Sequence, residues 1–144
     1  MVRTGKTGEV DPVRLGNRIR EEIRGRCVLF GHLIPYALEE QDVARVVVLR
    51  CNPRVLKARL KSRSYPRAKV VENVEAELIG VIAADSEESF GHTKVVEFDN
   101  SDAPVGEAAA KVARLLSTRK GRPDSLDWLR SYDSPEKLRS LLAL

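Results

Sequence analysis

The hydrophobic pattern in the middle of the chain predicts a buried strand that leads directly into a helix. Residues 46–49 read Val-Val-Val-Leu. A short, continuous apolar run rich in β-branched side chains is typical of a strand that is buried on both faces. Asn52 and Pro53 follow, and they suit the N-cap and the first position of a helix. The apolar positions after them recur at helical spacing: Val55, Leu56 and Leu60.

The remaining pattern alternates further helices with strands. Helices are expected over residues 11–24, 33–40, 66–90 and 103–118, and strands over residues 27–31 and 93–98, beside the central strand over residues 45–50. Such alternation implies right-handed βαβ units. The predicted fold class is therefore α/β, a parallel sheet with helices on both faces.

The end of the chain has a different organisation. Residues 119–123, Arg-Lys-Gly-Arg-Pro, read as a hinge or linker, and two short helices are expected after it, near residues 125–129 and from Ser134 onward. The one tryptophan, Trp128, is predicted to anchor this tail by packing rather than to stack on a nucleic-acid base. We therefore expect a main domain over residues 1–121 and a helical tail over residues 122–144.

The helix after the central strand opens a strongly basic segment. From Arg54 to Lys69 there are seven basic residues and no acidic one, and residues 62–66 interrupt the helix. A buried strand followed by a basic helix, a short break and a second helix is a recurrent way to close a cationic lid over phosphates. Arginine suits such a lid because its planar, permanently charged fork matches phosphate oxygens. From charge alone, a solvated helix face is the alternative.

Composition limits the class of protein. A chain of 144 residues fits one domain with a moderate core, and 42% hydrophobic and 32% charged residues indicate a soluble globular protein. The net charge of +4 suits phosphate-bearing partners without requiring nucleic acid. No apolar run is long enough to cross a bilayer and no signal-peptide core is present, so we expect a cytoplasmic protein with no membrane partner.

Neither the cysteines nor the N-terminal glycine-lysine-threonine carries a strong signal of chemistry. Cys27 and Cys51 lack metal-ligand spacing and are expected to be reduced thiols, with a bridge conceivable only if their strands are neighbours. A phosphate-binding loop needs a first glycine, four further residues and then Gly-Lys-Ser/Thr, with a strand ahead of it. For Gly5-Lys6-Thr7 that glycine would lie before residue 1, so a flexible polar start is the favoured interpretation.

Residues 46–78 resemble the archaeal and nuclear adenylate kinase family related to adenylate kinase isoenzyme six, whose members are P-loop nucleoside monophosphate kinases. The residues that match its pattern are Val48, Leu49, Arg50, Asn52, Pro53, Val55, Leu56, Arg59, Leu60, Arg63, Tyr65, Lys69, Glu72, Asn73, Val74, Glu75, Ala76 and Glu77. Ser64 stands where the family usually has glycine. The likeness extends more loosely from about residue 5 to residue 132, and it implies the P-loop α/β fold with five parallel strands.

The resemblance implies roles for the basic break and the helix after it. Arg63 corresponds to the lid arginine that contacts the phosphates of ATP. Arg67 and Lys69 would assist in nucleotide binding, and Tyr65 and Asn73 would support the site. The loop over residues 99–104 would lie beside the adenine base.

The resemblance also singles out the end of the expected strand at residues 27–31. The family ends this strand in Asp-x-His, which handles Mg²⁺ and the attacking water. Here Phe30 holds the aspartate position and only His32 matches. His32 is therefore a catalytic candidate whose metal partner is missing, and no metal ligand is assigned. A lone histidine after a strand is otherwise often structural.

In the family pattern, the first strand, the phosphate loop, the first helix and a further strand precede residue 1. That loop carries much of phosphoryl transfer, so three hypotheses follow. The first is an adenylate kinase or ATPase whose chain begins upstream, with ATP, ADP and AMP as ligands, Mg²⁺ as cofactor and a link to small ribosomal subunit assembly. The second is an inactive binding module for a ribosomal protein or RNA. The third is a chain that a partner completes, and exposed sheet edges would then also allow oligomers.

Overall fold

The computed structural model describes residues 10–118 and 126–143. The Gly5-Lys6-Thr7 motif, the expected linker over residues 119–123 and the expected domain boundary after residue 121 lie outside the described residues. Within those residues, no helix has both the length and the apolar character needed to cross a membrane.

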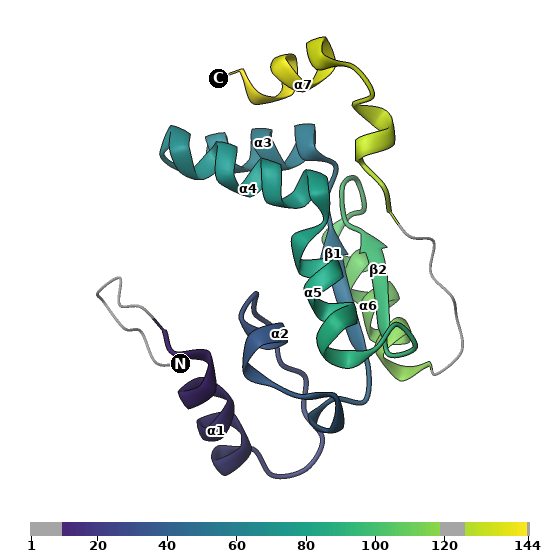
Figure 1. Cartoon of the computed structure of the whole chain (residues 1–144). Helices are drawn as coiled ribbons and strands as arrows, with labels where there is room; N and C mark the ends of the chain where they lie inside the picture. Colours follow the sequence, from purple (N-terminus) through teal and green to yellow (C-terminus); the bar gives the residue numbers. More distant parts are fainter. Residues whose placement is uncertain (1–9, 119–125, 144) are drawn as a thin grey trace.

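The centre of the fold is a parallel pair of strands, β1 (Val46–Arg50) and β2 (Val95–Asp99), with Val48 opposite Glu97. Helix α5 (Val81–Phe90) covers one face of this pair and α6 (Val105–Ser117) covers the other (Figure 1). One hydrophobic core forms on the α5 side, where Phe90 is fully buried. This arrangement confirms the predicted α/β class, a small parallel sheet with helices on both faces.

The other helices begin where the sequence provides caps. Helix α1 (Pro12–Glu22) starts after Asp11, whose carboxylate accepts a hydrogen bond from the backbone N of Val13 at 2.9 Å. Helix α3 (Pro53–Ser62) starts after Asn52, and α7 (Pro135–Leu142) after Ser134, in the same way. The further elements are α2 (Ile34–Ala37), the 3₁₀ helix η1 (Glu40–Asp42) and α4 (Arg67–Ile79).

The single helix expected over residues 66–90 is wrong, because Gly80 divides it into α4 and α5. Gly80 has φ 71° and ψ 34°, the left-handed conformation that commonly ends helices and that glycine adopts most easily. The guanidinium of Arg50 fills the space beside it, since an added Cβ at position 80 would lie 3.3 Å from Nη2 of Arg50. The chain therefore turns at this residue and starts a new helix.

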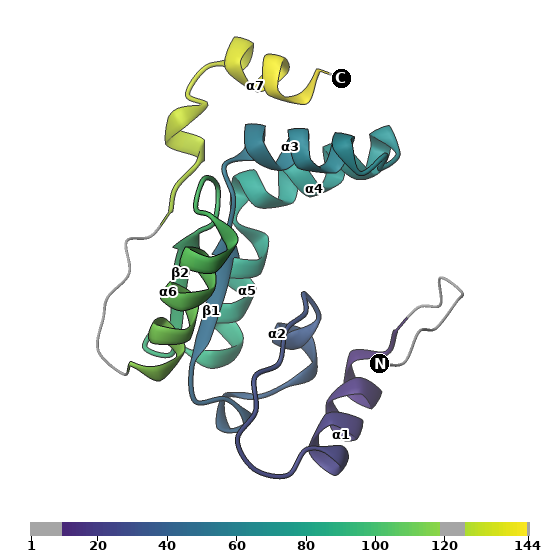
Figure 2. The same cartoon turned by 180° about the vertical axis from the view of Figure 1, so that it is seen from behind.

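The strand expected over residues 27–31 is also wrong, because these residues do not belong to the sheet. A strand requires a hydrogen-bonding neighbour, and among the described residues β1 pairs with β2 alone. The segment passes on the side of β1 that faces away from β2 (Figure 2). Its side chains are correspondingly open to solvent: Val28 is 72% exposed and Phe30 98% exposed. Cys27 is exposed and Cys51 buried, and both are free, as expected.

The C-terminal tail packs on a hairpin formed by α3 and α4. Between Leu126 and Ser131 the helix expected near residues 125–129 is reduced to one 3₁₀ turn, η2 (Leu129–Ser131). Beyond it, α7 lies across the hairpin (Figures 1 and 2). A second core joins them, formed by Leu60, Val70, Val74, Leu78, Tyr132 and Leu141. Trp128 packs against this core, which confirms its predicted role as an anchor.

Candidate functional site

The tip of the α3–α4 hairpin carries the second part of the basic segment, from Lys61 to Lys69. Leu60 and Val70 are buried on either side of the tip and fix the ends of the two helices. The carbonyl of Leu60 accepts hydrogen bonds from the backbone N of Arg63 and of Tyr65, each at 3.2 Å, which closes the turn tightly. Ser64 takes a left-handed φ of 58° within it. All residues from Lys61 to Lys69 are exposed.

Three cations of α3 contact other parts of the molecule. The guanidinium of Arg54 lies over the ring of Tyr132, 5.9 Å from its centroid. Lys57 Nζ donates to the carbonyls of Leu141, at 2.7 Å, and Ala143 near the end of α7. Arg59 donates to the carbonyls of Asn100, at 3.0 Å, and Ser101. These residues therefore connect α3 to the tail and to the loop after β2.

Three cations at the tip remain without a polar or ionic partner among residues 10–118 and 126–143: Lys61, Arg63 and Arg67. Tyr65 lies between them in the sequence and is 46% exposed. Lys61, Tyr65 and Arg67 line a shallow hollow with Val70 at its base. The fold thus separates the basic segment into internal cations and a cluster of free ones, which we call the tip cluster (Lys61, Arg63 and Arg67).

The two other residues expected to support this site have local partners. Lys69 forms an ion pair with Glu72, one helical turn further along, at 2.8 Å. Asn73 donates from Nδ2 to the carbonyl of Lys69 at 2.7 Å. Both lie on the exposed surface of α4 next to the tip cluster.

His32 is not part of the α3–α4 hairpin that carries these residues. It lies in an exposed turn between the unpaired segment over residues 27–31 and α2, not at the end of a strand. In the described part of the chain, no three His, Cys, Asp or Glu side chains gather in a group that could hold a metal ion. The described residues around His32 therefore do not form a Mg²⁺ site.

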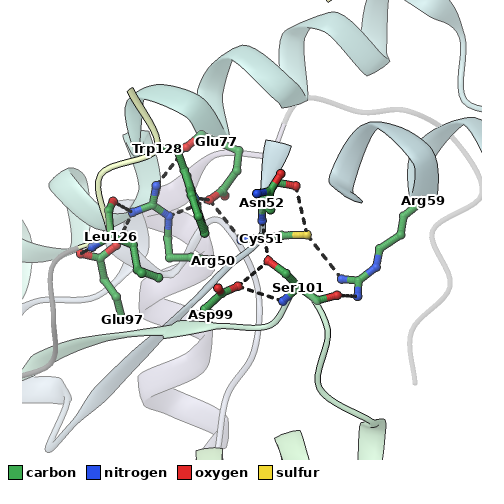
Figure 3. Close-up of polar contacts among 10 residues, drawn as sticks. All are labelled: Arg50, Cys51, Asn52, Arg59, Glu77, Glu97, Asp99, Ser101, Leu126 and Trp128. Carbon is green, nitrogen blue, oxygen red and sulfur yellow. Dashed lines mark hydrogen bonds and ion pairs between the residues drawn. The ribbon is translucent and has the colours of Figure 1, made fainter. Parts of the chain in front are cut away.

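The carboxyl ends of β1 and β2 hold a buried polar network that the sequence reasoning missed (Figure 3). Arg50 is 3% exposed, and its Nε lies 2.7 Å from Oε1 of Glu77. Its Nη1 pairs with Glu97 and also donates to the carbonyl of Leu126 at 3.2 Å. Burial opposes the charge of Arg50, but the two carboxylates outweigh burial and raise its pKa above the ordinary value. The one available signal was an arginine at the end of an apolar strand.

The loop after β2 is fixed by a second set of contacts (Figure 3). The hydroxyl of Ser101 donates to Asp99 and accepts from the backbone N of Asn52 at 2.7 Å. Arg59 reaches the same loop and lies 3.4 Å from the sulfur of Cys51. Burial raises the pKa of the Cys51 thiol, so this cysteine is not an activated nucleophile. The position of this loop beside a nucleotide base stays a prediction.

The fold defines a nucleotide kinase-like α/β protein, and comparison with known proteins gives its family. Residues 5–80 match the sequence profile of a family described as AAA domain. A protein of Thermococcus onnurineus named "Putative adenylate kinase" is 39% identical over 127 residues, which cover 87% of this chain and 67% of that protein. Proteins of the same name from Methanococcus maripaludis and Pyrococcus furiosus are 33% and 32% identical over 85% and 87% of this chain. The chain belongs to this adenylate kinase-like family of P-loop kinases.

The matched region is not the whole of these relatives. The alignments span 67%, 66% and 67% of the three proteins. The chain therefore corresponds to about two thirds of the length of each.

Proposed function

We propose that this chain takes part in adenylate kinase chemistry, in which the γ-phosphate of ATP is transferred to AMP to give two molecules of ADP. Family membership supports this reaction. The observation that carries the proposal is the tip cluster. Its three cations have no partner among the described residues, and at the end of a well-packed hairpin they suit a triphosphate. Phosphoryl transfer depends mainly on positioning and charge neutralisation, which this hairpin can supply in part.

Within this proposal, each residue has a distinct role. Arg63 binds the phosphates of ATP, and Arg67, with Tyr65 beside it, completes the hollow at the tip. Lys69 and Asn73 support the first turns of α4 through their local contacts. His32 is proposed to act near the transferred group once a nucleotide is bound. Mg²⁺ accompanies the nucleotide in this class of enzyme in general, although the described residues do not form its site.

The test is the affinity of the chain for ATP, measured by calorimetry on the wild type and on Arg63→Ala. A lost charge-assisted hydrogen bond weakens binding by roughly tenfold or more, so Arg63→Ala should bind ATP about tenfold more weakly. Arg130→Ala is the matched control, since Arg130 is an exposed arginine of the tail with a side-chain exposure of 87%. A wild-type chain that binds no ATP would contradict the proposed function. Equal affinity of Arg63→Ala and wild type would contradict the role of Arg63.

A second candidate function is RNA binding, including binding during assembly of the small ribosomal subunit. The observation that favours it is the same tip cluster around an exposed aromatic ring, because cations and a stacking platform together suit single strands. Titration with an oligouridylate at several salt concentrations separates the two functions. If RNA is the ligand, its affinity falls steeply as the salt concentration rises. The slope of log affinity against log salt should then be smaller for Arg67→Ala, by about the value of one phosphate contact.

A third candidate is completion of the sheet by another polypeptide, and two observations favour it. β1 has a hydrogen-bonded neighbour on one side in the described residues. On the other side, the segment with Phe30 runs unpaired, and Phe30 is 98% exposed. A parallel strand could add between them. Light scattering tests self-association, and a concentration-independent monomer would count against completion by a second copy.

We expect any of these activities in the cytoplasm.

A further inference from the structure

We propose that the segment over residues 126–143 is a strap that positions the α3–α4 hairpin, with Trp128 as its key positioning residue. The consequence for nucleotide binding rests on the proposed function, but the strap itself does not.

The chain connects the hairpin to the rest of the molecule at two places. One is the short link of Cys51 and Asn52 between β1 and α3, and the other is Gly80 between α4 and α5. Gly80 is a left-handed residue at which two helices meet, a place where a small backbone rotation swings the whole hairpin. Both links lie at the same end of the hairpin. The position of the tip cluster at the other end therefore depends on side-chain packing.

The strap begins on the sheet. The backbone N of Leu126 lies 3.4 Å from Oε1 of Glu97, to which it donates, and the carbonyl of Leu126 accepts from Arg50 at 3.2 Å. Arg50 ends β1 and Glu97 belongs to β2, so this end of the strap is attached to both strands. Figure 3 shows Leu126 joined to the Arg50 guanidinium, and Trp128 joined to Glu77.

The strap continues onto both helices of the hairpin. Trp128 donates from Nε1 to Oε1 of Glu77, on α4, at 2.9 Å. Further along, Tyr132 and Leu141 are buried in the core shared with α3 and α4. At the far end, Lys57 of α3 holds the last carbonyls of α7. The tail thus spans from the sheet to each helix of the hairpin.

One carboxylate oxygen joins these attachments. Oε1 of Glu77 receives Arg50 Nε at 2.7 Å, the backbone N of Cys51 at 3.2 Å and the indole N–H of Trp128. A swing of α4 away from the sheet must break these bonds together. Arg50 alone would join the strand to the hairpin through Glu77, and Trp128 adds a bond from the tail to the same oxygen. The strap therefore restricts the tip cluster to one position relative to the sheet.

The test is hydrogen exchange of the full chain, followed by mass spectrometry without any ligand. Trp128→Phe keeps a smaller aromatic side chain but removes the indole donor, and Lys57→Met removes the contact at the other end. Each should speed exchange in α3, α4 and α7 by about tenfold, as expected for the loss of a hydrogen bond to a charged or helix-end acceptor. Exchange in β2 and α6 should stay at the wild-type rate. Arg130→Gln is the matched control: Arg130 is on the same turn as Trp128, is 87% exposed and pairs only with its neighbour Asp127 at 3.1 Å among the described residues. An exposed local pair of this kind contributes little, so exchange should stay at the wild-type rate.

Two results would overturn the strap. One is unchanged exchange in α3 and α4 in both variants. The other is faster exchange everywhere, β2 included, which would make the tail part of the general core rather than a positioning element. ATP affinity of the same variants is measured separately, and Trp128→Phe should bind ATP more weakly. If the wild type binds no ATP, the proposed function fails while the exchange result still decides whether the strap exists.

Discussion

Nε of Arg50 lies 2.7 Å from Oε1 of Glu77, which joins the end of β1 to α4 by a buried ion pair. Glu97 of the neighbouring strand contacts the same guanidinium. The sheet, the hairpin and the tail therefore meet at one charged residue that water barely reaches. This arrangement fixes the direction in which the hairpin leaves the sheet.

Replacement of Arg50 should be strongly destabilising. Arg50→Met leaves the carboxylates of Glu77 and Glu97 without their partner in a buried site, and breaking a buried pair in this way costs about 3–5 kcal/mol of unfolding free energy. Urea denaturation measures this loss. The triple variant Arg50→Met, Glu77→Gln, Glu97→Gln removes the uncompensated charges and should recover part of it. A loss below about 1 kcal/mol in the single variant, a typical value for an exposed pair, would show that the network is unimportant for stability.

Ser64→Gly should stabilise the protein. Ser64 has φ 58°, a conformation that costs an L-residue about 1–2 kcal/mol relative to glycine. The greater freedom of glycine in the unfolded chain offsets part of this gain, so we expect a net increase of roughly 0.5–1 kcal/mol in unfolding free energy. The control is Ala58→Gly, an exposed position in the interior of α3, which should lower stability. Equal effects of the two substitutions would mean that the turn is not strained.

Gly80→Ala should be destabilising, because it places an L-residue where glycine now adopts a left-handed conformation. The left-handed backbone disfavours alanine by about 1–2 kcal/mol, and the new Cβ would lie 3.3 Å from Nη2 of Arg50. Gly106→Ala is the control, because Gly106 lies within α6 and an added Cβ meets nothing within 4 Å. That substitution should raise stability by roughly 0.5–1 kcal/mol. Thermal unfolding of both variants tests the difference in sign.

The ion pair between Arg20 and Asp42 should make stability depend on pH. The hydrogen bond from Arg20, with a second from the backbone N of Glu39, lowers the pKa of Asp42 below its ordinary value. A carboxyl whose pKa is lower in the folded state adds stability above its unfolded pKa of about 3.9, and this contribution disappears as the pH falls through the folded value.

The test compares the urea midpoints of the wild type and Asp42→Asn between neutral pH and the acid range. The difference between them should be largest at neutral pH and should shrink below about pH 4. A constant difference across this range would mean that the pair does not contribute through the charge of Asp42.

Local residue chemistry made several elements predictable. The apolar run at residues 46–49, the caps at Asp11, Asn52 and Ser134, and the break over residues 62–66 depend on neighbours within a few positions. The tip cluster was also accessible in part, since Arg63 and Arg67 stand out in a segment without acidic residues. Asn73 and Lys69 were named as site residues, but their contacts turned out to be local to α4.

The wrong predictions at residues 27–31 and 66–90 both concern contacts between segments that are far apart in the sequence. Residues 27–31 have the apolar composition of a strand, yet a strand exists only when a neighbour supplies its hydrogen bonds. Residues 66–90 have a helical pattern on both sides of Gly80, and the break there is accompanied by Arg50, thirty positions earlier, lying against it. Contacts with distant residues therefore override the local propensity for strand or helix in these segments.

The sequence by itself determined the α/β class, the positions of most helix starts, the basic segment and the family likeness, because each is a property of composition or short-range spacing. The tertiary structure alone decided which cations are free. Lys57 and Arg59 are used by the tail and the loop after β2, whereas Lys61, Arg63 and Arg67 face solvent. It also decided that Trp128 meets Glu77, 51 positions away. A charged side chain finds its partner through packing of the whole chain, and no local pattern encodes that distance.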